Sequence, residues 1–365
     1  MAAEEDHESV YAPGRRTIKI LLPEREGPLF IDVKGGHYVI DPTTGQILEN
    51  NFFGVQKVVD ATLNGLEWKS QYKNRFQITI SPKSPQTKIV VCGHEVKGSV
   101  TVYNLHQTLY VVLETDLEFY LEQKLTFLLK GEVLPAAVME ALAINERTNL
   151  YFWTENGSSP YFDLIDTEEE FSVWNNLITS SRAVRDASRA SEKFVNLYNG
   201  RPFPAHFCKH SAGVTLSYAR LFGKQSPAPA GICTPHAQKN RESTFWKTYL
   251  SSKDFETAFG VHKFQRIDIY QDAGSEKVYA VALKGEYEKK TVPIAVFQRK
   301  LGKERIKSSL FHVKKVADTF TLEGYGEGIG TGICLYEALR NLKEGDSALE
   351  ILAFFYPEAT CAQLR

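Results

Sequence analysis

The sequence predicts an α+β fold rich in β-strands, with two strand-forming blocks on either side of a helical segment. Three observations support this prediction. Between residues 17 and 113, short apolar runs alternate with turn signals such as KGG, DPTTG and SPKSP, a pattern typical of consecutive strands. From residue 117 to residue 153, apolar residues recur at helical spacing. From residue 266 onward, strand-like apolar runs return.

The composition is that of a globular protein with a sizeable core. The chain has 365 residues, of which 43% are hydrophobic and 24% charged, enough for one large domain or two smaller ones. Its net charge of −1 predicts no general attraction to nucleic acid or to a membrane surface. No apolar run approaches the roughly 20 residues that span a bilayer, so we expect no transmembrane segment.

The first residues are acidic and polar, unlike the basic start and apolar centre of a secretory signal peptide. Two interpretations stay open, a cytoplasmic protein or a mature chain whose leader has been removed. The five cysteines are an odd number, which argues against a complete disulfide framework.

The first block should form seven strands, each a short apolar run bounded by turn residues. They cover residues 17–22, 29–33, 37–40, 75–80, 88–91, 99–105 and 108–113. A polar leader, residues 1–16, precedes them. We therefore expect a flexible leader, an N-terminal β-rich region over 17–113 and a second region over 114–365.

The helical segment should contain helices over residues 117–129 and 134–153, the second with Pro135 in its first turn. On this second helix Glu140 and Arg147 share one face. A polar helix is expected over residues 180–197.

The second block should add strands and then two closing helices. The strands are expected at residues 266–271, 277–285, 291–298, 309–313 and 319–324. Helical spacing predicts a helix from Leu335 to Leu342. Ser347 and Glu350 form a capping-box pattern ahead of a last helix.

A glycine run, GYGEGIGTG, places glycine at every second position from Gly324 to Gly332. Its spacing fits neither the G-x-G-x-x-G dinucleotide motif nor a P-loop. Because a period of two is the period of a strand, the run predicts an extended segment with one face free of side chains. Such a face is either packed against another backbone or approached by a ligand.

Five histidines and cysteines could hold a metal ion. Three alternate along one short segment and two follow at C-x₂-H spacing, namely His206, Cys208, His210, Cys233 and His236. Thiolate and imidazole groups suit tetrahedral zinc. The spacing matches no standard finger, so scattered polar residues in a loop-rich region are the alternative.

Candidate catalytic groups include Glu132, Glu140 and Glu327, each of which would act as a general acid if burial raised its pKa. Most acidic residues, however, are solvated at the surface. Cys334 follows the glycine run at an expected helix start, which can activate a thiolate. The alternative for Cys334 is a small buried apolar residue.

Taken together, these segments resemble the sporulation stage II protein D and amidase-enhancer family of bacterial cell-wall proteins. The family's closing motif, G-x-G-W-G-H-G-V-G-M-S-Q-Y-G-A followed by a helix and I-L-x-x-Y-Y-P, is similar to Gly324–Ala338 and to ILAFFYP. Upstream, LGKERIKSSLF is similar to the family's L-G-x-x-x-L-K-S-T-x-F, and HSAGVT to its H-S-x-x-G-G-x-T. The ordered blocks extend over residues 17–365.

The resemblance implies a lytic transglycosylase of peptidoglycan, which cleaves the bond between N-acetylmuramic acid and N-acetylglucosamine in glycan strands without stem peptides. One glutamic acid would protonate the glycosidic oxygen and then act as base on the C6 hydroxyl, giving anhydro-muramyl ends. The family's acid precedes its A-R-T helix, which favours Glu132 and then Glu140 in this sequence. A pKa raised by apolar surroundings is expected of this acid.

The resemblance also implies substrate-binding residues, a location outside the cytoplasm and peptidoglycan as partner, with a cell-wall amidase or a division complex as a further partner. The implied substrate-binding residues are Arg147, Thr148, Ser211, Gly213, Gly326, Gly328, Gly330, Gly332, Cys334 and Tyr336. No cofactor is required, although some members bind zinc through histidine and cysteine near residue 208.

The sequence departs from the family in the glycine motif. The family's histidine, serine and glutamine fall on Ile329, Cys334 and Leu335. The alternative function is therefore a non-catalytic protein that binds glycan or stimulates an amidase and has lost the acid.

Overall fold

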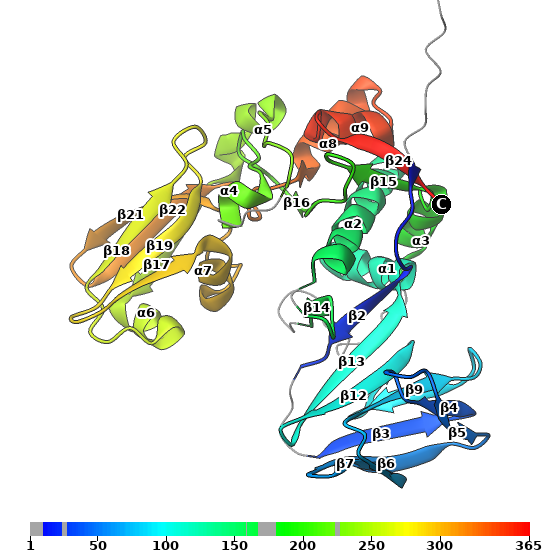
Figure 1. Ribbon diagram of the computed structural model, residues 1–365. Helices are drawn as coiled ribbons and strands as arrows, with labels where there is room; N and C mark the ends of the chain where they lie inside the picture. Colours follow the sequence, from blue (N-terminus) through cyan, green and yellow to red (C-terminus); the bar gives the residue numbers. More distant parts are fainter. Residues whose placement is uncertain (1–9, 24–27, 158, 167–179, 223–226) are drawn as a thin grey trace, which may run out of the picture. The chain divides into compact units, whose positions relative to one another are not determined.

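The computed structural model of the protein describes residues 10–23, 28–157, 159–166, 180–222 and 227–365. It confirms the predicted α+β, β-rich fold (Figure 1). The chain forms two compact units, each assembled from separate stretches of sequence, whereas the sequence suggested two continuous regions. The first unit comprises residues 1–12, 134–149 and 189–365, and the second comprises residues 13–133 and 150–188.

The second unit is built on two β-sheets. One has the order β14-β2-β13-β12-β9-β4-β5 among the described residues, with strands Leu164–Ile165, Thr17–Leu21, Thr108–Asp116, Ser99–Leu105, Gln77–Pro82, His37–Ile40 and Ile47–Asn51. The other has the order β11-β10-β3-β6-β7-β8, with strands His94–Val96, Lys88–Val91, Leu29–Lys34, Val55–Thr62, Gly65–Trp68 and Ser70–Lys73. The seven strands expected in this region are all present, and alternation along β2 buries Ile18 and Ile20.

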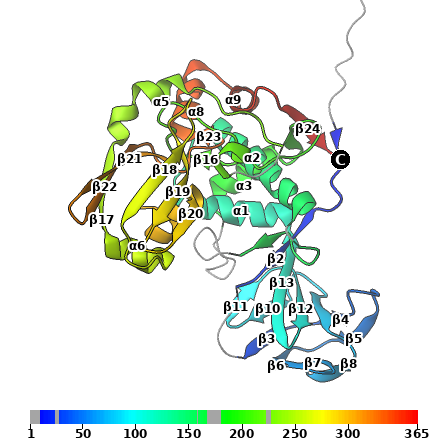
Figure 2. The ribbon, with the colours of Figure 1, turned by 60° about the vertical axis from the view of Figure 1, so that its left-hand side comes forward.

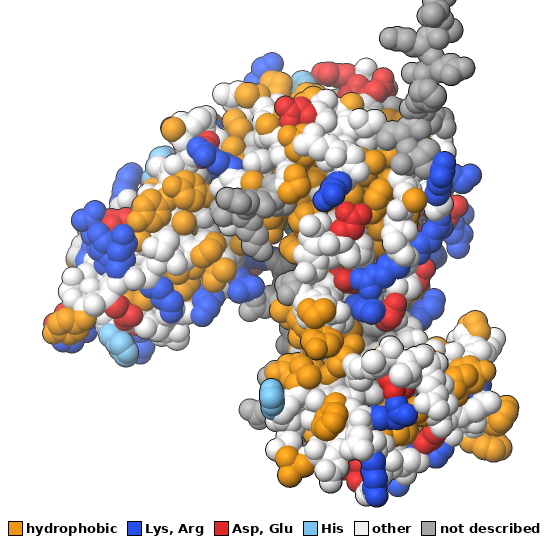
Figure 3. Space-filling model, viewed as in Figure 1, with side chains coloured by type: hydrophobic (Ala, Val, Ile, Leu, Met, Phe, Trp, Pro, Cys, Tyr) orange, Lys and Arg blue, Asp and Glu red, His pale blue; other side chains and the backbone are white. Residues whose placement is uncertain are grey.

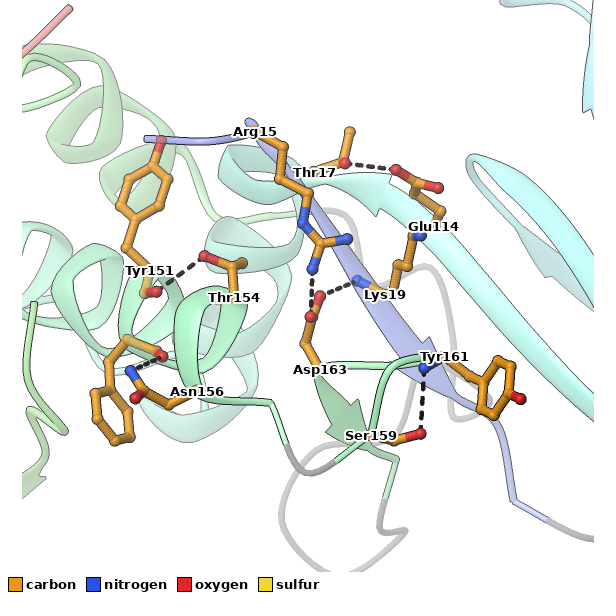
Figure 4. Close-up of polar contacts among 11 residues, drawn as sticks. Arg15, Thr17, Lys19, Glu114, Tyr151, Thr154, Asn156, Ser159, Tyr161 and Asp163 are labelled. Atoms are coloured by element: carbon orange, nitrogen blue, oxygen red, sulfur yellow. Dashed lines mark hydrogen bonds and ion pairs between the residues drawn. The ribbon is translucent and has the colours of Figure 1, made fainter. Parts of the chain in front are cut away.

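Asp163 connects a loop of this second unit to strand β2 through its carboxylate (Figure 4). The carboxylate accepts a hydrogen bond of 2.7 Å from the backbone N–H of Lys19 and forms an ion pair with Arg15. Burial raises the pKa of Asp163, and these two donors oppose that shift. The Thr17 hydroxyl of β2 donates a hydrogen bond of 2.6 Å to Glu114 on the neighbouring strand β13. These contacts hold the first strand of the sheet in register.

The first unit contains an aromatic core. Two helices and two three-stranded sheets, whose ribbons Figure 2 shows, pack around it. The sheets have the orders β17-β22-β21, with strands Trp246–Ser251, Thr319–Tyr325 and Leu310–Val316, and β18-β19-β20, with strands Arg266–Gln271, Val278–Lys284 and Lys289–Pro293. The helices are α6 (Ser252–Phe259) and α7 (Ile294–Leu301). Phe255 stacks on Phe264 and packs edge-on against Phe320, so aromatic contacts supply much of this core.

The remaining elements of the first unit surround the glycine run and the long helix α2 (Ala136–Asn156), whose first part belongs to this unit. The strands are β1 (Val10–Tyr11), β15 (Phe194–Leu197), β16 (Phe207–Cys208), β23 (Ile333–Cys334) and β24 (Thr360–Leu364). The helices are α4 (Tyr218–Phe222), α5 (Pro235–Lys239), the short 3₁₀ helix Arg241–Thr244, α8 (Leu335–Glu344) and α9 (Ala348–Phe355). The predicted capping box of α9 is confirmed, since Ser347 and Glu350 bond reciprocally.

Two predicted elements were wrong in part. Residues 291–298 do not form one strand, because β20 ends at Pro293 and α7 begins at Ile294. Ile294, Phe297 and Leu301 are buried at helical spacing, and a proline suits a helix start better than a strand interior. The expected helix over 180–197 is shorter, since α3 (Arg182–Ala190) is followed by strand β15.

Helix α1 (Leu117–Leu128) follows β13 directly, capped by Asp116, whose carboxylate accepts from the Phe119 N–H over 2.9 Å. In the described part of the chain, no helix has the length and apolar character needed to cross a membrane. Part of the leader is ordered, because Val10 and Tyr11 pair with β24. Figure 3 shows hydrophobic side chains on the surface of the second unit, where Phe52 and Phe53 are strongly exposed.

Replacing Asp254 with alanine should weaken the first unit in a pH-dependent way. Asp254 completes the capping box of α6 with Ser251 and pairs with Arg305. Hydrogen bonds from Ser251 lower the pKa of Asp254 to about 2. Because the folded-state pKa lies below the unfolded value, the contribution is present at neutral pH and disappears as the pH falls from about 4 to about 2.

We expect Asp254→Ala to cost about 1 kcal/mol at pH 7, the usual effect of a lost cap. Urea unfolding at several pH values measures this cost. Asp186→Ala is the control, since Asp186 is 61% exposed and pairs only with Arg182 on its own helix. An equal cost for Asp254→Ala at pH 7 and at pH 2 would contradict the assignment.

Candidate functional site

The glycine run connects strand β22 to strand β23 through a left-handed backbone. Four of its glycines have positive φ angles, which are 91° at Gly326, 98° at Gly328, 85° at Gly330 and 74° at Gly332. The intervening residues have ordinary φ angles. The expected extended segment is therefore not formed here. The period of two arises because every second residue occupies a region that only glycine adopts without strain.

The side of each glycine that would carry a Cβ is occupied by atoms of the protein itself. A Cβ on Gly328 would lie 2.8 Å from the Cβ of Cys208, and a Cβ on Gly330 would lie 2.6 Å from Nζ of Lys277. At the other two left-handed positions the nearest atoms are carbonyl oxygens. Close internal packing accounts for these glycines, which agrees with the first of the two alternatives that the sequence left open.

Two cysteines lie side by side beneath the glycine run. Strands β16 and β23 pair in parallel, with Cys208 directly opposite Cys334, and both side chains are buried. The two thiol groups are hydrogen-bonded to each other. This bond lowers the pKa of Cys334 to about 6, helped by the Ser211 N–H, which donates to its sulfur over 3.3 Å. The same bond, followed by burial, raises the pKa of Cys208.

A buried lysine completes this cluster. Lys277 is 2% exposed, and its ammonium group donates to the carbonyl oxygen of Ser211 over 2.8 Å. Burial lowers the pKa of Lys277 to about 8, and the charges of the two cysteines oppose that shift. Sequence analysis missed this residue, although a lysine directly before the apolar run VYAVAL is a signal for a buried charge.

Hydroxyl and carboxylate groups fix the backbone around the cluster. The Ser211 and Thr234 hydroxyls are 2.7 Å apart, and the N–H of Gly213 donates to Ser211 Oγ over 3.4 Å. Glu337, fully buried and also missed from sequence, accepts from the N–H of Ala237 over 2.8 Å at the first turn of α5. Ser211 therefore serves the protein's own contacts in this structure and offers no exposed hydroxyl to a substrate.

One edge of the cluster reaches the surface. His210 packs against the half-buried ring of Tyr336, 4.8 Å between centroids. Its Nδ1 accepts from the Ala212 N–H over 3.1 Å, while Nε2 has no hydrogen-bond partner among the described residues. Burial, followed by the Lys277 charge, lowers the pKa of His210. Tyr336 is thus the predicted substrate-binding residue best placed to meet a ligand.

The five predicted zinc ligands have different surroundings. His206 stacks on Tyr218, with ring centroids 5.5 Å apart, and His236 lies 3.3 Å from a Glu344 oxygen. Cys233 is exposed. Within the described ranges, no three histidine, cysteine or acidic side chains are grouped closely enough to hold a metal ion. Zinc binding stays a prediction. Of the five residues, Cys208 belongs to the cysteine pair, and His210 lies two residues after it.

Arg147 and Thr148, predicted to bind substrate, are fully buried on helix α2. The Arg147 guanidinium donates to the carbonyl oxygens of Ser191 at 2.8 Å and Phe194 at 3.0 Å. Thr148 accepts from the Asn196 N–H over 2.9 Å. These bonds tie α2 to strand β15 and its preceding turn, so the structure gives both residues a role in packing.

The two candidate acids lie on either side of the start of α2. Glu132 is exposed in the turn after α1, where its N–H donates to the Leu129 carbonyl over 2.8 Å. Glu140 is half-buried within α2. Glu132 belongs to the second unit and Glu140 to the first. Glu132 is thus accessible to a large substrate, but its exposed position lacks the apolar surroundings that were expected of the acid.

Three known proteins are similar to this chain, although no family model matches it. An uncharacterized protein of Brachyspira hyodysenteriae is 23% identical over 367 residues, which cover 95% of this chain and 94% of that protein. Stage II sporulation protein D of Bacillus subtilis is 23% identical over 209 residues, covering 54% of this chain and 60% of that protein. The amidase enhancer of Bacillus subtilis is 36% identical over 70 residues, covering 19% of this chain and 10% of that protein.

These similarities support in part the resemblance seen in the motifs. Two of the three proteins carry the names of the family that the motifs resemble, and the third extends over nearly the whole chain. The alignments cover 60% and 10% of the two named proteins. The chain is therefore a distant relative of stage II sporulation protein D across about half of its length.

Proposed function

We propose that this protein is a lytic transglycosylase of bacterial peptidoglycan that acts outside the cytoplasm on glycan strands stripped of their stem peptides. The observation that carries the proposal is the alignment with stage II sporulation protein D over 54% of the chain, together with the ordered motifs from LGKERIKSSLF to ILAFFYP. Glu132 is the proposed acid and base, since it precedes helix α2 and is exposed to solvent.

The proposed chemistry needs one carboxyl group in two successive roles. Glu132 would first protonate the glycosidic oxygen and then take the proton of the muramyl C6 hydroxyl, which closes the anhydro ring without water. This differs from hydrolytic glycosidases, which use a pair of carboxyl groups. Independently of Glu132, the half-buried Tyr336 beside His210 in the first unit presents an aromatic ring of the kind that stacks on sugars.

A second candidate function is a non-catalytic protein that stimulates a cell-wall amidase. Two observations favour it. The strongest identity, 36%, is to the amidase enhancer, although over only 70 residues. In addition, Arg147 and Ser211, which the resemblance assigns to the substrate, are buried among the protein's own groups. A cell-wall amidase is the partner that this second function requires.

Product analysis separates the two functions. We expect the wild-type protein to release anhydro-disaccharides from amidase-treated glycan strands, detected by mass spectrometry. Glu132→Gln should lower the rate at least about 100-fold, the usual effect of losing a general acid, whereas Glu140→Gln and the exposed control Glu358→Gln should retain it.

Two outcomes would contradict parts of this proposal. Absence of anhydro products from the wild-type protein would exclude transglycosylase activity, and stimulation of an added amidase by the same sample would then support the second function. Equal product from wild type and Glu132→Gln, with loss in Glu140→Gln, would move the acid to Glu140.

A further inference from the structure

The paired cysteines have a geometry that suits a reversible disulfide. We propose that Cys208 and Cys334 form a redox-active pair, which hydrogen peroxide converts into an intramolecular disulfide. The two residues face each other in the register of parallel strands β16 and β23. Paired residues on neighbouring strands lie roughly 5 Å apart, within the Cα separation of about 4.4–6.8 Å that a disulfide requires.

The two side chains also point to the same side of the strand pair. Register partners on neighbouring strands project their side chains to the same face, so the two thiol groups share one side of the strand pair. Both residues are free cysteines, 2% and 0% exposed.

Cys334 lies at the start of a helix, beside backbone N–H donors. Cys334 is the N-cap residue of helix α8, where the backbone N–H groups and the helix dipole stabilise negative charge. The Ser211 N–H donates to its sulfur over 3.3 Å. The ammonium group of Lys277 bonds to the carbonyl of the same Ser211, which places a positive charge in the cluster.

The glycine run leaves only backbone over the pair on one side. Gly328 packs directly against the Cβ of Cys208 and is itself partly exposed. A bulky oxidant has no room beside two buried sulfur atoms, whereas a molecule the size of hydrogen peroxide needs only a small opening of the backbone. Hydrogen peroxide is therefore the proposed oxidant.

The reaction proceeds in two balanced steps. The Cys334 thiolate attacks one oxygen of hydrogen peroxide, forming an S–O bond and breaking the O–O bond, and the departing hydroxide takes a proton to become water. The sulfur of Cys208 then attacks the sulfur of the sulfenic acid, forming the S–S bond and expelling a second water. The proton of the Cys208 thiol leaves with the expelled hydroxide, which completes the second water. Two thiols and one peroxide thus give one disulfide and two waters.

The experiment treats the native full chain with a small excess of hydrogen peroxide, removes the peroxide, and then unfolds the protein in urea so that alkylation blocks every remaining thiol, including buried ones. Mass spectrometry of the intact protein should show three alkylated cysteines instead of five, and peptide mapping should join residues 208 and 334. Reduction should restore five alkylation sites. Cys208→Ser and Cys334→Ser should each abolish the cross-link, while Cys233→Ser, at an exposed cysteine, should form it as the wild type does.

A wild-type comparison keeps the test valid if a variant fails to fold. The same treatment in urea should give no preference for the 208–334 pair, because the strands that align it are lost. The proposal is overturned if both thiols in the native protein stay open to alkylation after peroxide treatment. It is also overturned if elemental analysis finds one equivalent of zinc that protects both thiols from peroxide. Since the readout is a mass, its failure leaves the proposed transglycosylase function untouched.

Discussion

Gly332→Ala is expected to destabilise the protein by on the order of 3 kcal/mol or more, enough to unfold a large fraction of a marginally stable chain. Gly332 has a φ angle of 74°, which costs any other residue roughly 1–2 kcal/mol. In addition, its Cβ would lie 1.8 Å from the carbonyl oxygen of His206. That carbonyl cannot move freely, because it accepts a hydrogen bond from the N–H of Ile333.

Gly200→Ala is the matched control for this experiment. Gly200 has a φ angle of 75°, but no atom lies within 4 Å of the position of its Cβ. It should therefore show only the conformational cost of about 1 kcal/mol. Urea unfolding of both variants measures the difference. If the two variants lose equal stability, the close approach at Gly332 does not matter and our explanation of the glycine run is wrong.

Arg147→Met is expected to cost about 2–5 kcal/mol, because two carbonyl oxygens lose their donor and each such loss costs roughly 1–3 kcal/mol. The substitution keeps the apolar stem but leaves the carbonyl oxygens of Ser191 and Phe194 without their donor. Thermal or urea unfolding measures the loss. Arg182→Met is the control, because the Arg182 side chain is 89% exposed, and it should change stability by less than about 0.5 kcal/mol.

This variant also decides between packing and substrate binding at position 147. If Arg147 binds glycan, a folded Arg147→Met sample should lose affinity for amidase-treated sacculi with little change in unfolding free energy. If it holds α2 against β15, as the structure indicates, the unfolding free energy should fall and the fraction that stays folded should bind glycan normally. A stable variant with normal binding would contradict both roles.

The strand pattern in the first block could be read from sequence because alternation directly reports burial. Residues such as Ile18 and Ile20 alternate with polar neighbours, and the turns between runs are rich in glycine and proline. The region from Ile47 to Lys73, which forms β5 to β8, was not predicted. Its strands carry many exposed polar residues and few regular apolar positions, so the pattern is weak.

The site was predictable in residue type but not in arrangement. The sequence placed Cys334 at an expected helix start and left two alternatives open, an activated thiolate or a small buried residue; the structure confirms the helix start and shows the side chain to be fully buried. The sequence could not indicate that Cys208 lies opposite, because that pairing depends on two distant strands. Lys277 was missed although a lysine beside an apolar strand run is a signal in the sequence; its packing against Gly330, where a Cβ would lie 2.6 Å from its Nζ, depends on the tertiary fold.

Strand β24 has a consequence for folding during synthesis. It is the central strand of the sheet β1-β24-β15, pairing in parallel with Val10–Tyr11 and antiparallel with Phe194–Leu197. Both outer strands leave the ribosome long before their common partner, so this sheet has a very high contact order. Until β24 is translated, β1 and β15 lack the strand that joins them, so this sheet is among the last parts of the fold to be completed.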